Sequence, residues 1–519
     1  MIQAARVADD DETDSFRRWL EAEPADEVAD DLDALRAHLG ALQDADPDRA
    51  ASSRLMESAA TRALDISARV KSSLQEVGLP LPRALHVVVT RLARALLAIA
   101  QGLEAEAAST GPGAARAERA DREARVRLAL LLCHEAFVVS AMSAASAPLG
   151  LWAFAHRLAS ELPGDLSYAS MTLMAAAQPE SFTARQLNWI ADFLAAQQPA
   201  VLPAASEEST ENAWWVLVSA DAAPVSSARR LPPAGGDVRR FSAAPFDQAL
   251  LVRIRQLEAV IAGAEGGGEM AAVDMAEVEM LDAEDEALPL GLTPIEVLAL
   301  LRTLRERWLS PPLRMQRRRP HHYMVQVCVG LRALWELARG REEADRVVEW
   351  QVLNESPGGY AIMNIAGIEG ELSSGVVLGL RRPGEASWTV CAVRWVRSDN
   401  PDQVELGLQV LALSYSAVQV AFRGTPLRGV APALALPVME PVRRHAAFLA
   451  PAGTYTSRRF IFLREGTQLS DHRRIDGATR KAGVIAGARG GIHQFVHLLL
   501  VLDGEVEGQL RVLARYRAD

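Results

Sequence analysis

The chain has 519 residues, of which 49% are hydrophobic and 23% are charged, so its composition is that of a globular protein too long for a single core. Its formal net charge of −11 argues against general binding to nucleic acid or to an anionic membrane, because both are held by basic surfaces. The three cysteines, each inside an apolar segment and none in C-x-x-C spacing, indicate buried thiols in a reducing compartment rather than disulfides or a zinc site: Cys133, Cys328 and Cys391.

The start of the chain has no targeting pattern. Residues 1–14 are acidic and contain little apolar material, which predicts a disordered tail. A signal peptide needs a positively charged start, and a membrane helix needs an uncharged apolar run of about 18 residues. We therefore expect a cytoplasmic protein without a membrane span.

Residues 15–263 have the patterns of a mainly helical domain. Within 84–104, apolar residues recur at three- and four-residue steps, which is typical of an amphipathic helix. Thr183 and Gln186 have the spacing of a capping box, which predicts the start of a later helix. Up to about Gln198 we predict an α-helical bundle or solenoid of roughly six to eight helices.

A strand and one more helix are predicted after this bundle. Ala213–Ser219 is rich in aromatic and β-branched residues and predicts a lone strand, and Phe246–Ala262 predicts a helix. The tryptophans of the apolar segments are expected to be core residues rather than a stacking platform: Trp152, Trp189, Trp214 and Trp215.

An acidic linker is predicted over 264–292. Its stretch from Glu265 to Leu288 contains nine acidic residues and no basic residue. One interpretation is a solvated spacer. The other is that its carboxylates lie on the basic stretch Arg302–Arg319 in the free protein and compete there with an anionic ligand.

A helix and an arginine-rich arm follow the linker. Thr293 is an N-cap residue, Pro294 occupies the first helical position, and Glu296 reinforces this start, so a helix is predicted from here to the residues before Pro311. We expect the next arginines to lie on a flexible arm: Arg314, Arg317 and Arg318.

Short segments with strand propensity and turn signals make up the rest of the chain. They predict a small β-barrel within 293–425, which includes the preceding helix and arm, and a second β-rich domain over 426–519. Short helices are expected over Arg332–Arg346 and Ser414–Phe422. The barrel strands are predicted at Met324–Val329, Val347–Leu353, Gly359–Ile365, Gly375–Leu380 and in the 388–411 hairpin, and the later strands at Leu434–Met439, Arg459–Leu463, Lys481–Ala486 and Phe495–Val501.

Two short motifs carry the chemistry. The arm contains R-x-x-x-R at Arg314 and Arg318, and planar guanidinium groups grip phosphate bidentately and reach guanine O6 and N7. Asn354 and Ser356 share one face of a strand, so an amide and a hydroxyl converge on one spot. Gly358 and Gly359 then allow a tight turn and close approach of a ligand to the backbone.

R-x-x-x-R followed by [D/N]-x-S-x-x-G resembles the signature of PilZ domains, the bacterial receptors for cyclic di-GMP. The resemblance covers about 310–425, roughly a fifth of the chain. It implies an α+β multidomain fold, with an N-terminal all-α bundle or solenoid followed by a PilZ-like six-stranded β-barrel and a second small β-rich domain. Long PilZ proteins of this layout resemble those that proteobacteria use in type IV pilus, motility and biofilm control.

The resemblance also implies a ligand, a site and an output. Cyclic di-GMP is expected to bind Arg314, Arg317, Arg318, Asn354, Ser356, Gly358 and Gly359. A protein partner is expected on the helical half, and neither a nucleic acid polymer nor a cofactor is expected. The alternative function is a structural or scaffold protein whose PilZ barrel is degenerate and does not bind.

Other constellations are weaker. His321 and His322 near Cys328 lack further ligands at a recognised metal spacing, and the histidines are expected to belong to the basic arm. Ser470, Asp471 and His472 have the residue types of a catalytic triad but no nucleophile elbow. We therefore predict neither a metal site nor an enzyme.

Overall fold

The computed structural model describes most of the chain between residues 13 and 502. The described residues are 13–44, 49–108, 116–197, 205–206, 214–266, 292, 294–311, 318–340, 347–364, 372–422, 431–440, 443, 446–451, 460–464, 481–485 and 496–502. Most of the predicted acidic tail and acidic linker lies outside these residues, as do Arg314 and Arg317.

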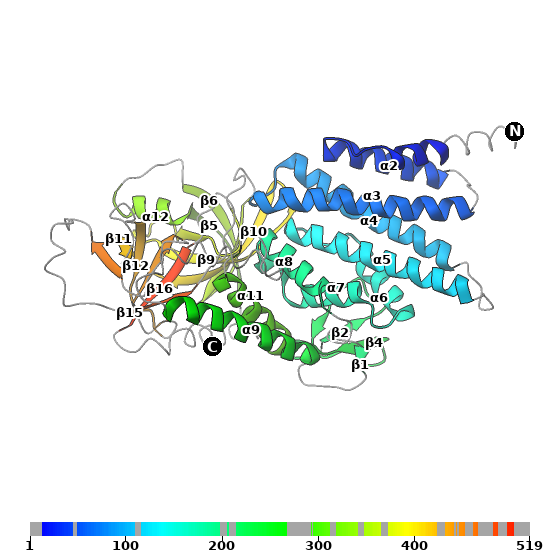
Figure 1. Ribbon diagram of the computed structural model, residues 1–519. Coiled ribbons are helices and arrows are strands. Elements are labelled where there is room, and N and C mark those ends of the chain that lie inside the picture. The colour runs from blue at the N-terminus through cyan, green and yellow to red at the C-terminus, as the bar shows by residue number, and fades with distance from the viewer. Residues whose placement is uncertain are drawn as a thin grey trace.

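The N-terminal half is a layered helical domain, shown in blue to cyan in Figure 1. One continuous core of leucine, alanine and aromatic side chains runs through it. The capping box predicted at Thr183 and Gln186 is present and starts α8. A helix over 13–21 precedes the named elements, which are α2 (Val28–Asp44), α3 (Arg49–Glu76), α4 (Arg83–Ala108), α5 (Arg116–Met142), α6 (Leu151–Glu161), α7 (Leu166–Ala176), η1 (Pro179–Ser181) and α8 (Ala184–Ala195).

A small sheet packs on this helical domain. The predicted lone strand is β2 (Trp214–Leu217), and the prediction that it stands alone is wrong because it pairs with two neighbours in the sheet order β1-β4-β2-β3. Two of the other strands have only two residues, and the third contains two arginines, so none has the pattern of a strand in sequence: β1 (Ala205–Ser206), β3 (Val225–Ser226) and β4 (Val238–Phe241). All four tryptophans predicted as core residues are buried.

Two later helices also belong to the helical core. These are α9 (Ala244–Gly266) and α11 (Pro294–Leu309). The Trp308 side chain is fully buried, and its indole nitrogen donates to the Leu173 carbonyl over 2.8 Å. The helix that the sequence grouped with the barrel at 293–425 therefore packs with the helical domain, since its apolar side faces that core.

Six strands form a closed antiparallel barrel in the order β10-β7-β6-β5-β8-β9. Its interior is lined by side chains from every strand, including the fully buried Trp350. The predicted six-stranded barrel is confirmed. The strands are β5 (Arg319–Val329), β6 (Val347–Ser356), β7 (Gly359–Asn364), β8 (Val377–Arg381), β9 (Thr389–Asn400) and β10 (Gln403–Ala412).

A second sheet follows the barrel in the order β14-β11-β12-β13-β16-β15. The helix predicted at Ser414–Phe422 is wrong: this segment is β11 (Ser416–Phe422), which pairs with a strand on each side. Its small and apolar residues are compatible with a strand when β12 and β14 pair with it. The other strands are β12 (Ala431–Leu436), β13 (Ala447–Pro451), β14 (Phe460–Arg464), β15 (Lys481–Ile485) and β16 (Val496–Leu502).

The short helix α12 (Leu331–Leu337) joins the barrel to the second sheet. It lies within the segment where the sequence predicts a short helix. Leu331 and Leu334 are buried in a third core with residues of both sheets. The Trp335 indole donates to the Val418 carbonyl over 2.7 Å, and the Tyr415 hydroxyl donates to the Leu334 carbonyl over 2.8 Å.

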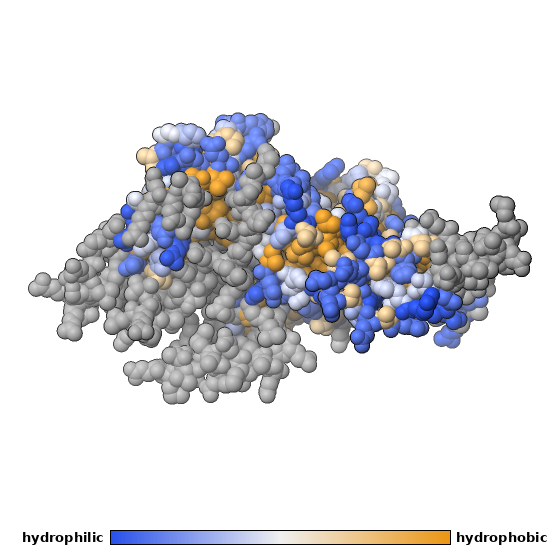
Figure 2. Space-filling model, turned by 90° about the horizontal axis from the view of Figure 1, so that it is seen from above, coloured by the Kyte–Doolittle hydropathy of each residue, from blue (hydrophilic) through white to orange (hydrophobic). Residues whose placement is uncertain are grey.

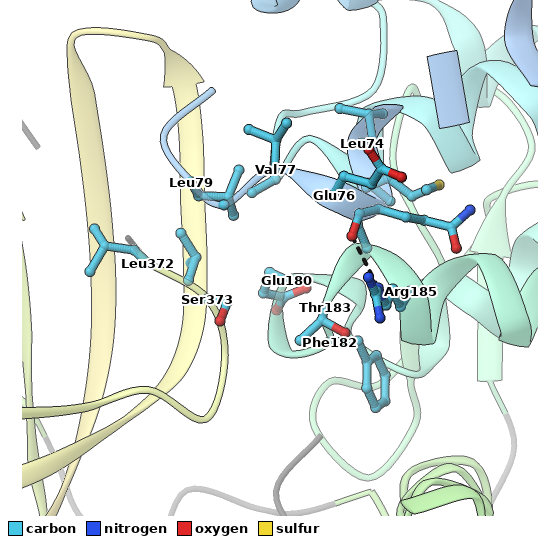
Figure 3. Close-up of a pocket in the computed structure, with 17 residues that line it drawn as sticks. Leu74, Glu76, Val77, Leu79, Glu180, Phe182, Thr183, Arg185, Leu372 and Ser373 are labelled. Carbon is cyan, nitrogen blue, oxygen red and sulfur yellow. Dashed lines mark hydrogen bonds between the residues drawn. The ribbon is translucent and has the colours of Figure 1, made fainter. Parts of the chain in front are cut away.

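The helical domain docks on one end of the barrel. Leu79 and Leu372 exchange two backbone hydrogen bonds of 2.9 Å, and the Ser398 amide donates to the Ala144 carbonyl over 2.8 Å. Ala144 itself is buried in the barrel core. A small cavity of about 40 Å³ lies at this junction. Figure 3 shows its lining, with Leu79 beside Leu372 and with Ser373 facing the η1 to α8 segment.

The described surface is mostly hydrophilic on the face seen in Figure 2, where apolar residues gather in limited areas. The exposed large hydrophobic residues of the described part are far apart along the chain, for example Val87, Leu231 and Leu413. Among the described helices, α4 has the length and hydropathy of a membrane-crossing helix, but 44% of its most apolar window is buried inside the protein. Its buried residues, such as Leu92, Leu96 and Ile99, belong to the core of the helical domain.

A largely buried polar cluster joins α3 and α5 in the helical domain. Lys71 and Glu135 form an ion pair of 2.6 Å, and the Ser67 hydroxyl donates to the same carboxylate over 2.7 Å. The adjacent His134 is buried, and the Nε2 atom has no hydrogen-bond partner among the described residues. Burial lowers the pKa of His134 to about 4, because charging the imidazole there costs solvation.

This depressed pKa predicts a loss of stability in mild acid. The unfolded chain binds a proton at His134 near pH 6.5 and the folded chain only near pH 4, so the free energy of unfolding falls as pH drops between these values. At pH 5 the contribution of His134 should be a loss of about 2 kcal/mol relative to pH 8. Urea unfolding at pH 5 and pH 8 should show this loss of stability in the parent, and the loss should be absent in His134→Gln.

His322→Gln is the matched control, because His322 is exposed. This variant should keep the pH dependence of the parent. Equal pH dependence in His134→Gln and the parent would contradict the assignment.

Candidate functional site

A β-bulge in β6 decides which side of the barrel the Asn354 motif faces. Val352 pairs with Ile362, but Asn354 pairs with Ala361, so Leu353 is one extra residue in β6. Val352 and Ile362 point into the barrel core. Since the extra residue reverses the alternation, Asn354 and Ser356 lie on the outside of the barrel.

Arg318 lies beside this outer face. It stands immediately before β5, whose Pro320 pairs with Asn354. One guanidinium nitrogen of Arg318 donates to the Asn354 side-chain oxygen over 3.2 Å. The two halves of the predicted motif are therefore in contact, although 35 residues separate Arg318 from Asn354 along the chain. The inserted α12 accounts for part of that spacing without disturbing the pairing of β5 with β6.

Two glycines let backbone and ring atoms approach closely on this face. A Cβ atom at Gly359 would lie 2.0 Å from the Leu408 carbonyl oxygen of β10, so no other residue fits without moving that strand. A Cβ atom at Gly407 would lie 1.8 Å from the indole nitrogen of Trp395. The Trp395 ring therefore lies flat against the outside of β10.

A hollow of about 350 Å³ opens on the outer face between these groups. Its size falls within the range of small-molecule sites, about 300–1,000 Å³. The lining residues are Arg318, Gly358, Gly359, Arg394, Trp395, Gly407, Leu408 and Gln409. Of the predicted site residues, Arg318, Gly358 and Gly359 line it directly, Asn354 contacts Arg318, and the Ser356 hydroxyl donates to the Gly359 carbonyl over 3.3 Å.

Arg394 and Trp395 line the hollow, and the sequence motifs do not predict them as candidate site residues. Gly407 pairs with Trp395 while Leu408 pairs with Val393, so Arg394 is an extra residue in β9. A bulge re-aims the side chain that it adds, and here it turns a second guanidinium toward the hollow. An arginine and a tryptophan in succession on a strand are the only signal for this pair in the sequence.

These groups are suited to an anionic ligand with aromatic rings. Two guanidinium groups border the hollow, and each can hold a phosphate or the acceptor edge of a guanine. The Trp395 ring gives a flat surface against which a planar base fits.

A polar cluster lies on the inner side of the same strand segment. Glu355 accepts a hydrogen bond of 2.5 Å from the Tyr323 hydroxyl and one of 2.7 Å from Arg382, and the His321 ring nitrogen lies 3.4 Å from its other oxygen. The Tyr323 hydrogen bond lowers the pKa of Glu355, and burial with this hydrogen bond raises the pKa of Tyr323.

The histidines differ from their prediction. His321 and His322 were expected on the basic arm, but they belong to β5, which begins at Arg319. Cys328 is fully buried on the far part of the same strand. Among the described residues, no group of three or more histidine, cysteine, aspartate or glutamate side chains has the arrangement of a metal site.

Two family models match the chain. The N-terminal domain of the cyclic-di-GMP receptor FimW matches residues 14–162, and the middle PilZ domain of this receptor matches residues 336–416. No curated protein gives a significant match. The first match lies in the helical domain, and the second contains the Asn354 motif, β9 and β10. The resemblance to PilZ-domain cyclic di-GMP receptors is confirmed, whereas Arg314 and Arg318 lie before the matched range.

The close contact between Gly359 and β10 predicts that a methyl group added at Gly359 will strongly lower stability. Gly359→Ala should lower the free energy of unfolding of the barrel by at least about 2 kcal/mol, because the added Cβ must push the Leu408 backbone away. Gly40→Ala is the control, since Gly40 lies in α2 and a Cβ atom added there would have no atom within 4 Å. This variant should raise the free energy of unfolding by up to about 1 kcal/mol. Urea titrations measure both, and similar small effects would contradict the close approach.

Proposed function

We propose that this PilZ-domain protein is a receptor that binds cyclic di-GMP on the outside of its barrel and couples the level of this second messenger to a protein partner. The two family matches support a cyclic di-GMP-binding receptor. The observation that carries the proposal is the contact of Arg318 with Asn354 at the edge of a hollow that Arg394 also lines.

The proposed ligand contacts follow from the chemistry of each group. Arg318 and Arg394 hold phosphate or a guanine edge, and the Asn354 amide and Ser356 hydroxyl read polar atoms of the ligand. Gly358 and Gly359 give the ligand access to the backbone. Arg314 and Arg317 remain proposed contacts from the segment before β5.

The same strand supports coupling to the helical domain. Arg394 and Trp395 of β9 line the hollow, and the next residue, Val396, lines the interdomain cavity. Ser398 then bonds Ala144, and the Asp399 carboxylate accepts from the Ser146 amide over 2.6 Å. A ligand that shifts β9 acts directly on the contacts that hold the two domains together.

The output is proposed on resemblance. We propose a cytoplasmic receptor in type IV pilus, motility or biofilm control, with its protein partner on the helical domain. The three free cysteines are buried thiols, which fits a reducing compartment. The alternative is a scaffold whose barrel does not bind, and ligand titration separates the two.

Binding itself should depend on both arginines. Arg318→Ala and Arg394→Ala should each weaken cyclic di-GMP binding by at least about 1.5 kcal/mol, because each removes charge-assisted hydrogen bonds to the ligand. Isothermal titration calorimetry measures the affinity. Cyclic di-AMP should bind more weakly than cyclic di-GMP, because it lacks guanine O6.

Arg397→Ala is the matched control on the same strand. Arg397 is exposed and pairs across from Glu405, away from the hollow. It should leave affinity within the error of the parent. No binding by the parent would favour the scaffold, and parental binding by both site variants would place the ligand elsewhere.

A disulfide between the domains tests the coupling. Leu79 and Leu372 form a hydrogen-bonded antiparallel pair, whose Cα atoms lie about 5.5 Å apart and so suit a disulfide. In Leu79→Cys/Leu372→Cys, oxidation should change cyclic di-GMP affinity by at least about fivefold, and reduction should restore it, as expected for a coupling free energy of about 1 kcal/mol or more.

Each single cysteine variant serves as the control for oxidation alone. The native cysteines are buried and should not interfere. Equal affinity of the oxidised and reduced double variant would show that the docked helical domain does not sense the ligand.

A further inference from the structure

We propose that Glu355 is a positioning residue, which holds Arg318 in the ligand site by fixing the start of β5 from the opposite side of the barrel wall. This inference rests on the proposed function and adds a residue that contacts no part of the hollow. It follows from the polar cluster on the inner side of β6 and from the pairing of β5 with β6.

Glu355 lies between two site residues but faces away from them. It pairs with Tyr360, whose ring packs against the barrel core, whereas its neighbours Asn354 and Ser356 lie outside. The carboxylate is about one-quarter exposed and receives partners from two other strand regions. Its role is therefore to join strands, and direct contact with a ligand in the hollow is blocked by its own strand.

The start of β5 pairs with β6 on the near side of an irregularity, Arg319 with Glu355 and Pro320 with Asn354. Arg319, Pro320 and His322 are exposed. The register between β5 and β6 shifts between Pro320 and Tyr323, so the regular ladder is interrupted just before the site. Glu355 bridges this irregular part of the ladder, because His321 lies within it, Tyr323 lies at its end, and both side chains contact the carboxylate.

Arg382 completes the attachment from a third part of the barrel. It follows β8 directly and donates to Glu355 over 2.7 Å, and its guanidinium lies over the Tyr323 ring at 5.2 Å. The start of β5 is thus held between β6 and the end of β8. Since Arg318 is the residue before β5, its distance from Asn354 depends on this attachment.

Loss of the carboxylate should release the start of β5. The Tyr323 hydroxyl and Arg382 then lose their shared acceptor. The irregular part of β5, between Pro320 and Tyr323, loses its side-chain contacts with β6. Arg318 is then held less firmly beside Asn354, so a ligand must order the arginine again at a cost in affinity. The fold of the barrel should persist, because its apolar interior is unchanged.

The first measurement uses the full chain without added ligand. Hydrogen exchange of the peptide that covers 319–324 should be at least about tenfold faster in Glu355→Ala than in the parent, as expected for local opening. Tyr323→Phe removes one hydroxyl and keeps the ring, so it should give a smaller increase. Glu349→Ala is the matched control, since Glu349 is an exposed carboxylate on the same strand, and it should leave exchange unchanged.

The second measurement is a double-mutant cycle on cyclic di-GMP binding. Glu355→Ala should weaken binding by about tenfold in the parent background, the scale of effect expected from a misplaced binding group. In the Arg318→Ala background the same change should cost less than about twofold, because the residue that it positions is gone. A general structural defect would weaken binding equally in both backgrounds.

The two measurements separate this inference from the proposed function. Faster exchange with no cyclic di-GMP binding by the parent would support the attachment and overturn the ligand. Binding by the parent with unchanged exchange in both Glu355→Ala and Tyr323→Phe would overturn the positioning role. So would equal losses of affinity in the two backgrounds.

Discussion

The extra residue at Leu353 is the constraint on which the candidate site depends. A strand without it would turn Asn354 to the same side as Val352, into the apolar interior. With it, the amide and the Ser356 hydroxyl face outward beside Arg318, and Glu355 turns inward to its own polar partners. One inserted residue thus separates the groups suited to contact a ligand from those that hold the strand.

The barrel is also the central unit of the molecule. The end of β9 is bound to the helical domain through backbone and carboxylate contacts, and α12 joins the barrel to the second sheet. The hollow lies on β9 immediately before the interdomain contacts. A change at the hollow therefore has a short covalent path to the helical domain, without a chain of intermediate side chains.

The helix α11 gives a second connection between the two halves. Trp308 fixes its end in the helical core, and the Arg307 guanidinium donates to the Ala177 carbonyl and stacks over Phe182 at 4.6 Å. Arg318 lies nine residues after the end of α11 and contacts the barrel. The described residues before and after 312–317 are thus held in different domains, while most of the predicted flexible arm lies outside the described residues.

The sequence alone determined what depends on local interactions. Helix starts such as Thr183 with Gln186, the short strands of the barrel and the Asn354 to Gly359 motif are read from neighbours a few residues apart, where capping, alternation and glycine content act. The tertiary structure decided the bulge at Leu353, the strand state of 416–422 and the place of Arg394 and Trp395 in the site. Each of these depends on which strands pair and in what register, and register is set by partners far along the chain, whose positions no local pattern contains.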